Sequence, residues 1–525
     1  MNLLLITLIL LLALFSIKIS HKSGIPSLIL FLFLGMGFSY FGIDFNDFHI
    51  VDKISTLSLM VIMFYGGFST NWTMCKKVAF KASILASFGV IGTSLLTGLF
   101  CYYILHFNFT ESLLLGSIVG STDYACVSNI LISKKLNLKY STAPLLEIES
   151  GSNDPTAYTL TVIFLSIMLG KNISVPLLIF KQVFFGVLIG FGVGFAFIKS
   201  LKIFKLNEDG LFSVYIAAIM LGTYGLCSII QANGYLALYI LGIYIGNVEY
   251  VGKKDVIFFY DGLTSLTQIA LFFLLGLLSN VYEVIRYIPS GLLIMLFMLF
   301  FARPVVVFSL MKPFKLKNNQ LALISIAGIR GAAAIAFSIM AVNTNLNFSI
   351  DIFHIVFVIC LFSSLLQGLI MPLATKKLDM LDNSDTVLKT FNYYQDKTNL
   401  GFIETKILKN SKWIGKKLSD LQLAFNVIIA KIERGNKTIV PRGDTIILEN
   451  DTLILAGQSH FDDTGINLVE ITISSNHKWA NMHLKNIDID KNELIICLKD
   501  NNGQIIIPNG NTYLNINDRI ILLKI

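Results

Sequence analysis

The chain has 525 residues, of which 54% are hydrophobic and only 14% are charged. Soluble proteins usually carry about 25% charged residues, so the composition excludes a wholly soluble protein. The net charge of +8 does not indicate a nucleic-acid partner, because the basic residues lie mostly in short loops between apolar runs, as membrane topology predicts. The six cysteines form no CxxC pair and indicate no disulfide framework.

Apolar segments of membrane-spanning length follow one another from the first residue to about residue 378, and the sequence then becomes polar. We predict an all-α polytopic membrane domain (1–378), a linker (379–398) and two cytoplasmic α+β modules (399–460 and 466–525). The first apolar segment lacks a basic leader and a small-residue cleavage site, so we interpret it as an uncleaved helix. The predicted spans, about thirteen in number, are 2–17, 24–42, 54–70, 82–105, 112–133, 144–169, 174–198, 211–231, 234–248, 264–281, 287–311, 320–342 and 352–375.

Positive charge alternates between the loops that join these spans. One set of loops carries two or three lysines each, such as Lys76, Lys77 and Lys81. The other set holds only Lys53, Lys171, Lys181 and Arg286. The positive-inside rule therefore places the N-terminus outside and the C-terminal region in the cytoplasm.

Three charged residues lie near the middle of predicted spans: Asp123, Asp154 and Arg330. Ten helical residues rise about 15 Å, half of a hydrocarbon core of about 30 Å, so all three lie near one plane. Each would be costly if it faced lipid. A single such residue could be a structural hydrogen-bonding group, but three at one depth indicate that they face one another, water or a ligand.

Polar residues cluster in the stretch ESGSND (149–154) at the start of a long apolar run. Ser150 and Asp154 are four residues apart and share one helix face, while Glu149 and Asn153 form the neighbouring stripe. Such a group of side chains is typical of a buried polar site.

Glycine and proline near these residues indicate irregular helices. Pro155 has no N–H, so the carbonyl of Gly151 loses its helix partner, and we expect a bent, locally open helix there. The stretches GSTD (120–123) and GIRG (328–331) predict helix breaks beside a charge. Two broken, crossing helices in different halves of the domain are typical of secondary transporters built from inverted repeats.

Six motifs in sequence order now suggest a family. They are GSTD (120–123), ESGSND (149–154), NGYLALYILGIYIGN (233–247), DGLTSLTQIALFFLLGLL (261–278), FARPVVVF (301–308) and GIRGAAAI (328–335). With these motifs the chain resembles bacterial monovalent cation:proton antiporters of the NhaP/CvrA type. The resemblance implies alternating-access exchange of protons for K+ or Na+, without a cofactor or enzymatic activity, by a homodimer embedded in the lipid of the cytoplasmic membrane. The physiological role would be pH, cation or volume homeostasis.

The resemblance also assigns roles to individual residues. Cation and proton binding falls to five side chains: Asp154, Asn153, Asp123, Thr122 and Ser150. Of these, Asp154, Asp123, Ser150 and Thr122 would be the ligands of a monovalent cation. Glu149 and Arg330 would form a structural ion pair.

Three further residues are secondary candidates: Ser152, Arg303 and Tyr65. Arg303 lies nearer the cytoplasmic end of its span and could instead extend its head group to the membrane surface. Tyr65 stands where members of the family often carry an acidic residue before a double glycine. This substitution leaves the site with one carboxylate fewer and leaves ion selectivity open.

The chemistry of exchange follows from electrostatics. A monovalent cation is coordinated by carboxylate, hydroxyl and carbonyl oxygens. A carboxylate partly removed from water binds either a proton or a cation, because burial disfavours its bare charged form. Competition at Asp154 would give exchange, and low pH would inhibit it. A single aspartate also suggests one proton per cation, hence electroneutral exchange, by analogy with the family.

An internal repeat follows residue 400. The matching residues, 66 or 67 positions apart, are Trp413 and Trp479, Pro441 and Pro508, and Asp451 and Asp518. Each copy is predicted to form a short helix and then alternating strands such as VIIAKI, TIVP and DTLILAG. The copies resemble TrkA-C (RCK-C) modules, which implies dimeric sensing of a small ligand, such as a nucleotide. No GxGxxG fingerprint is present, and a passive dimerisation role stays open.

Three other functions remain as alternatives. A ligand-gated cation channel would favour rings of ligands along a pore rather than one titratable cluster. An intramembrane aspartyl protease would use Asp123 and Asp154 as a dyad, but such proteases resemble one another in a Gly-x-Gly-Asp motif that these positions lack. A sodium-coupled solute carrier would need a larger site with substrate-binding side chains.

Overall fold

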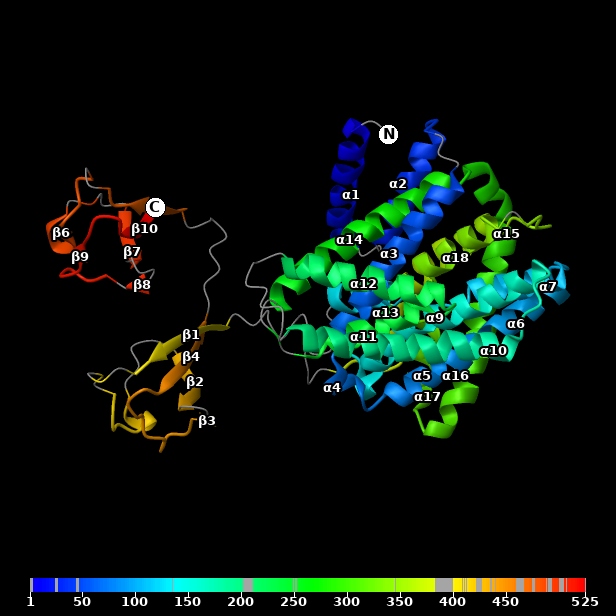
Figure 1. Cartoon of the computed structure of the whole chain (residues 1–525). Helices are drawn as coiled ribbons and strands as arrows, with labels where there is room; N and C mark the ends of the chain where they lie inside the picture. The colour runs from blue at the N-terminus through cyan, green and yellow to red at the C-terminus, as the bar shows by residue number, and fades with distance from the viewer. Residues whose placement is uncertain are drawn as a thin grey trace. The chain divides into compact units, whose positions relative to one another are not determined.

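The chain forms two compact units, Met1–Asp396 and Lys397–Ile525, in the computed structural model shown in Figure 1. The first unit is helical, and the second consists mainly of strands. The structure describes residues 3–23, 27–43, 47–134, 136–201, 211–248, 250, 253–344, 346–382, 400–407, 409, 411, 413–421, 427–434, 437–439, 441–458, 467–474, 477–487, 489, 493–499, 505–506 and 508–524.

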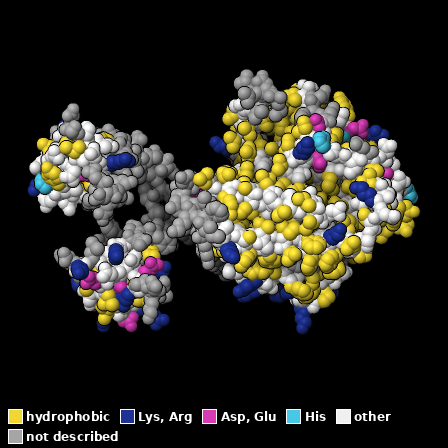
Figure 2. Space-filling model, viewed as in Figure 1, with side chains coloured by type: hydrophobic (Ala, Val, Ile, Leu, Met, Phe, Trp, Pro, Cys, Tyr) yellow, Lys and Arg dark blue, Asp and Glu magenta, His cyan; other side chains and the backbone are white. Residues whose placement is uncertain are grey.

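Apolar helices make up the first unit, and Figure 2 shows hydrophobic side chains over much of its visible face. In the part of the chain that the structure describes, 7 helices or runs of joined helices are long and apolar enough to cross a membrane. A helix satisfies its own backbone hydrogen bonds, as the hydrocarbon interior requires. In chain order the helices are α1 (Leu3–Ser23), α2 (Ser27–Tyr40), α3 (Phe48–Ser69), α4 (Trp72–Cys75), α5 (Ala79–Ile84), α6 (Val90–Tyr103), α7 (Phe109–Ile118), α8 (Tyr124–Ser133), α9 (Thr142–Met168), α10 (Val175–Phe180), α11 (Gly186–Leu201), α12 (Leu211–Ile229), α13 (Gly234–Gly246), α14 (Lys253–Leu278), α15 (Val281–Phe297), α16 (Arg303–Met311), α17 (Asn318–Ile326), α18 (Ala332–Val342), α19 (Ile352–Phe362) and α20 (Gly368–Lys377).

Each predicted span coincides with one helix or with a run of consecutive helices. The largest difference is at α14, which begins at Lys253 rather than at residue 264. Its first turns carry Asp255 and Asp261, so hydropathy alone places the start of the apolar segment too late. The predicted breaks are present, since α7 ends before residues 119–123 and α17 ends before residues 327–331.

Four π-helical turns interrupt the longer spans in the described ranges: η1 (Leu85–Gly89), η3 (Lys181–Phe185), η4 (Met298–Ala302) and η6 (Ser363–Gln367). Such turns are rare and often occur at functional positions. The turn η4 directly precedes Arg303, and η6 packs beside the break between α17 and α18. Hydrophobic periodicity does not reveal a single inserted residue, so the sequence pattern did not predict them.

Close packing of α3 against α13 fixes one wall of the unit. A Cβ added to Gly67 would lie 2.1 Å from the carbonyl oxygen of Tyr239, and one added to Gly242 would lie 2.2 Å from that of Phe64. Small residues let helix backbones approach in this way inside membranes. The same crossing sets the Tyr239 ring against α9, where a Cβ at Gly151 would lie 2.7 Å from Cε2 of that ring.

Two antiparallel sheets with one topology form the second unit. The strand orders are β1-β4-β2-β3 and β5-β10-β7-β8, and a short pair, β6 with β9, accompanies the second sheet. This repetition agrees with the sequence repeat. The strands are β1 (Leu400–Lys406), β2 (Val427–Arg434), β3 (Lys437–Ile439), β4 (Thr452–Gln458), β5 (Asn467–Thr472), β6 (Met482–His483), β7 (Glu493–Lys499), β8 (Ile505–Ile506), β9 (Tyr513–Leu514) and β10 (Arg519–Lys524).

The two copies share a buried aspartate at the turn before their last strand. Asp451 accepts a hydrogen bond from the Leu448 amide at 2.8 Å, and Asp518 accepts one from the Asn515 amide at 2.7 Å. In the first copy Arg434 also contacts this aspartate, and its Nε and Nη2 each lie 2.8 Å from an Asp451 oxygen. This bidentate guanidinium holds the pKa of Asp451 below its usual range.

Secondary structure in these modules differs from the prediction in two respects. The sequence pattern did not indicate β1 and β5, whose apolar residues do not alternate cleanly with polar ones. Within the described residues the expected short helix appears as a 3-10 turn, Leu418–Asp420 in the first copy and Leu484–Asn486 in the second. Local propensity sets neither feature, because both depend on pairing with distant strands.

The first residues of the predicted linker (379–398) belong to the helical unit. The Lys139 amide donates to the carbonyl of Met380, and the Asp382 amide donates to the carbonyl of Asn137, both at 2.9 Å. Residues 383–399 lie outside the described residues. The predicted domain boundaries therefore stay a prediction.

Candidate functional site

The two helix breaks contact each other inside the first unit. The Asp123 amide donates to the carbonyl of Ile329 at 2.7 Å, which joins the two irregular segments directly. A Cβ at Gly331 would lie 2.1 Å from Oδ2 of Asp123, so only glycine fits there. The glycines that predicted the breaks therefore allow one break to approach the other.

Arg330 connects the second break to the first. Its Nη1 donates to the carbonyls of Gly120 at 2.5 Å and Ser121 at 2.7 Å. These carbonyls lie beyond the last turn of α7, where backbone oxygens have no partner within the helix. The π turn η6 holds the backbone of Arg330, because Ser363 Oγ accepts from its amide at 2.9 Å and Ser364 Oγ donates to its carbonyl at 3.0 Å.

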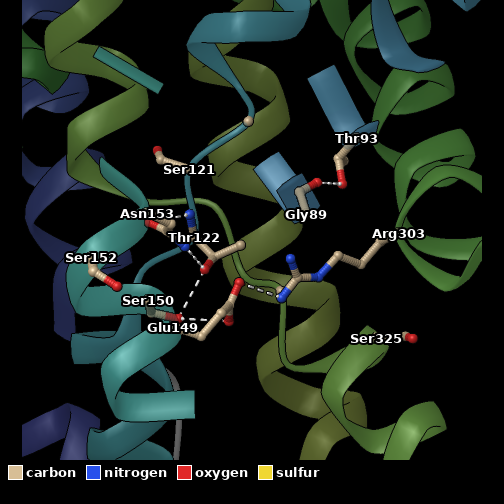
Figure 3. A network of polar contacts seen from close by, with 12 residues as sticks. Gly89, Thr93, Ser121, Thr122, Glu149, Ser150, Ser152, Asn153, Arg303 and Ser325 are labelled. Atoms are coloured by element: carbon tan, nitrogen blue, oxygen red, sulfur yellow. Dashed lines mark hydrogen bonds and ion pairs between the residues drawn. The ribbon is translucent and has the colours of Figure 1, made fainter. Parts of the chain in front are cut away.

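The predicted pairing of Glu149 with Arg330 is wrong. Glu149 Oε1 instead lies 2.9 Å from Nη2 of Arg303, and Figure 3 shows the two side chains reaching toward each other. Both are buried, at 0% and 2% exposed, so Arg303 does not extend to the membrane surface. The reason lies in geometry that sequence spacing does not reveal: the guanidinium of Arg330 is bound by the carbonyls of the first break, and η4 places Arg303 beside Gly328.

Thr122, Ser150 and Asn153 form a compact hydrogen-bonded group, as Figure 3 shows. The Thr122 and Ser150 hydroxyls are 2.8 Å apart. Asn153 donates from Nδ2 to the Thr122 hydroxyl and accepts from the Thr122 amide at 3.3 Å. All three are buried. The structure thus brings together three of the five predicted binding side chains through direct contacts.

Asp154 lies beside this group, 7% exposed. Ser121 and Asp123 lie close enough to interact with its carboxyl group, yet its Oδ1 has no hydrogen-bond partner among the described residues. The Asp123 carboxylate accepts from the amide and thiol of Cys126 at 3.4 and 3.2 Å. Two carboxylates and several hydroxyl and carbonyl oxygens therefore gather at one point.

The remaining secondary candidates point elsewhere. Ser152 donates to the carbonyl of Ile148 on its own helix at 2.5 Å, and Figure 3 shows its side chain directed away from Asn153. Tyr65 donates to Oδ1 of Asp261 on α14 at 3.1 Å. Tyr65 thus takes the position expected for an acidic residue, and a carboxylate from another helix contacts its hydroxyl.

The predicted local opening of the helix at Pro155 is not present. Helix α9 continues without a break from Thr142 to Met168, because a proline removes only one donor. Asn233 supports the helix at this point: its Nδ2 donates to the carbonyl of Pro155 at 2.8 Å and to the hydroxyl of Thr159 at 3.1 Å. Sequence reasoning singled out neither Asn233 nor Ser121, although both lie within the motifs that carried the resemblance.

Comparison with known proteins finds family models for the helical unit and for the first C-terminal module. Residues 7–377 match the family model described as sodium/hydrogen exchanger, transmembrane, and residues 402–460 match the TrkA-C domain. The chain is 31% identical over 451 residues to the K(+)/H(+) antiporter NhaP2 of Shewanella oneidensis, covering 84% of this chain and 78% of that protein. It is also 31% identical over 376 residues to the K(+)/H(+) antiporter NhaP of Alkalimonas amylolytica, covering 70% of this chain and 65% of that one.

A solved structure supports the fold of the helical unit. The sodium proton antiporter MjNhaP1 from Methanocaldococcus jannaschii superposes with a TM-score of 0.64 at 23% identity, covering 71% of this chain and 97% of that protein. The predicted architecture, a multi-pass helical membrane domain followed by TrkA-C-like modules, is confirmed.

Proposed function

Because this chain belongs to the sodium/hydrogen exchanger family, we propose that it is a secondary active antiporter that exchanges protons for K+, Na+ or both. The relatives named above are K(+)/H(+) antiporters, which favours K+ as the first ion to test. The single observation that carries the proposal is the unpartnered oxygen of Asp154 beside two helix breaks.

The local geometry suits a monovalent cation. Asp154 and Asp123 supply carboxylates, and Thr122 and Ser150 supply hydroxyls. These fixed oxygens offset the free-energy cost of removing the cation from water, and the cation in turn neutralises a buried charge. When no cation is bound, a proton on the same carboxyl group neutralises that charge instead. Proton and cation therefore exclude each other at Asp154.

The charges around the site support exchange of one proton for one cation. The cluster holds two guanidinium groups, Arg303 and Arg330, and three carboxylates, Glu149, Asp123 and Asp154. With both aspartates ionised the cluster has a net charge of −1, so one cation or one proton makes it neutral. Glu149 is committed to Arg303 at 2.9 Å, which leaves the aspartates to carry the exchange.

The proposal also covers the membrane, orientation, oligomeric state and regulation of the chain. We place the chain in a bacterial cytoplasmic membrane, with the N-terminus outside and the TrkA-C-like modules in the cytoplasm, in accordance with the alternation of loop lysines. We further propose that the chain acts as a homodimer and that the cytoplasmic modules regulate exchange by binding a small ligand. No enzymatic activity forms part of the proposal.

A dye assay in proteoliposomes tests the function. Vesicles with an acidic interior receive K+ or Na+, and a pH-sensitive dye reports proton release. The native protein should restore fluorescence on cation addition, Asp154→Asn should not, and Ser152→Ala should behave as native, because its hydroxyl bonds only its own helix. Cation movement down its own gradient without proton coupling would favour the channel alternative instead.

A further inference from the structure

Buried polar atoms without hydrogen-bond partners follow one face of α9. Among the described residues they include both oxygens of Glu147, the hydroxyl of Tyr239 and Oδ1 of Asp154. Glu147 is 4% exposed. Buried polar groups in proteins are nearly always hydrogen-bonded, so such a group requires an explanation.

These atoms lie in a row. Residues 147, 151 and 154 share one helix face, because they are four and then three positions apart. Glu147 and Asp154 are separated by about two turns, or about 10 Å along the helix axis. Between them, a Cβ at Gly151 would lie 2.8 Å from the Tyr239 hydroxyl oxygen. The Tyr239 hydroxyl therefore sits against α9 between the two carboxyl groups.

None of the described groups that act on Glu147 is basic. The side chains that interact with it are Thr70 at the end of α3, Cys75 of α4 and Tyr239 of α13, while Lys76 and Lys77 are exposed beyond α4. An ionised carboxylate buried without a partner is very costly, whereas the neutral acid costs far less. Burial without a basic partner therefore favours the neutral, protonated form of Glu147.

The neighbouring glutamate, Glu149, makes the contacts that are typical of a structural residue. Glu149, two positions further along α9, has Arg303 at 2.9 Å and accepts from Ser150 at 3.4 Å. Glu147 has no basic partner among the described groups that act on it, and the hydrogen-bonding group that acts on it is the neutral hydroxyl of Thr70. A leucine or glutamine would fill the same volume without a titratable group, so packing alone does not account for an acid at this position.

We propose that Glu147 is a second proton-binding residue of the exchange, on the cytoplasmic side of Asp154. This inference rests on the proposed antiport function. The proton leaves the O–H bond of Glu147 and forms an O–H bond at Oδ1 of Asp154; the Tyr239 hydroxyl, which has no hydrogen-bond partner among the described residues, lies between the two carboxyl groups and would have to approach each of them in turn to relay it. The cation leaves Asp154 as the proton arrives, and Glu147 then takes a proton from the cytoplasmic side.

The test compares two matched variants in the full-length protein. Glu147→Gln removes the titratable group, and Glu111→Gln is the control, because Glu111 is also a buried glutamate but is bonded by the Ser349 amide and hydroxyl. In the proteoliposome assay, Glu147→Gln should lower the maximal rate about tenfold or more, since positioned proton-transfer groups contribute about 10²–10⁴-fold. The KM for the cation should stay within about twofold of native, and Glu147→Asp should recover part of the rate.

An infrared measurement provides a readout that does not depend on transport. Difference spectra of the native protein across a pH titration should contain the carbonyl stretch of a protonated carboxylic acid, and Glu147→Gln should lose part of that signal while Glu111→Gln keeps it.

The possible failures are distinguishable. Native exchange, with Glu147→Gln equal to Glu111→Gln in rate and spectrum, would overturn the inference alone. A parallel change of rate and KM in both Glu147 variants would mark a structural residue and also overturn it. Absence of exchange by the native protein with either ion would overturn the antiport function itself.

Discussion

The two helix breaks have similar shapes and opposite chemistry. The break after α7 contributes oxygens, from the carbonyls of Gly120 and Ser121 and the side chains of Thr122 and Asp123. The break after α17 contributes a positive charge, Arg330, whose guanidinium donates to those carbonyls at 2.5 and 2.7 Å. Both breaks expose backbone groups that a continuous helix would satisfy. The first break therefore offers oxygen ligands, and the second break balances their negative charge with Arg330.

Removing the charge of the second break should have the largest effect. Arg330→Gln leaves the carbonyls of Gly120 and Ser121 poorly satisfied and makes the cluster one unit more negative. Removing one partner of a buried charge interaction costs about 3–5 kcal/mol of stability, and exchange should be almost abolished because the first break loses the donor that binds its carbonyls. Arg286→Gln, at an exposed surface pair, is the control in the same dye assay. A near-native exchange rate for Arg330→Gln would contradict the idea that the second break balances the charge of the first.

The buried ion pair between Glu149 and Arg303 should matter mainly for stability. Glu149→Gln leaves Arg303 buried without its partner and should lower the free energy of unfolding by about 3 kcal/mol. The double variant Glu149→Leu with Arg303→Met removes both charges and should regain most of that loss. Thermal unfolding in detergent measures both. Equal destabilisation by the single and double variants would contradict the pairing.

The contact between the breaks should be sensitive to a single methyl group. Gly331→Ala would place a Cβ 2.1 Å from Asp123 Oδ2 and force the breaks apart, which should cost about 1–3 kcal/mol of stability and slow exchange. Gly222→Ala is the matched control, since nothing lies within 4 Å of a Cβ there. Thermal unfolding and the dye assay should separate the two variants; identical behaviour would contradict the close contact.

The smallest effect is expected at the ligand side of the first break. Thr122→Val removes the hydroxyl that contacts Ser150 and Asn153 while keeping the shape of the side chain. The loss of about 1 kcal/mol should raise the cation KM about fivefold, and Thr122→Ser should stay close to native. A cation titration in the dye assay gives both values. An unchanged KM for Thr122→Val would remove its hydroxyl from the ligand set.

The sequence allowed the spans, both breaks and the proximity of Thr122, Ser150 and Asn153 to be predicted, because glycine next to charge at mid-depth is a local signal. It did not allow the partner of Glu149 to be predicted. Arg303 and Arg330 were both available, and the choice depends on the π turn η4 and on which carbonyls the first break leaves open. Glu147 was not predicted either, since only packing shows that none of the described groups around it is basic.

The most direct test of the account measures proton release on cation binding. Purified native protein in weak buffer receives K+ or Na+, and a pH indicator counts the protons released. We expect the native protein to release one proton for each cation that it binds. We expect Asp154→Asn neither to bind the cation nor to release a proton. Cation binding without proton release, or equal release from Asp154→Asn, would contradict competition at Asp154.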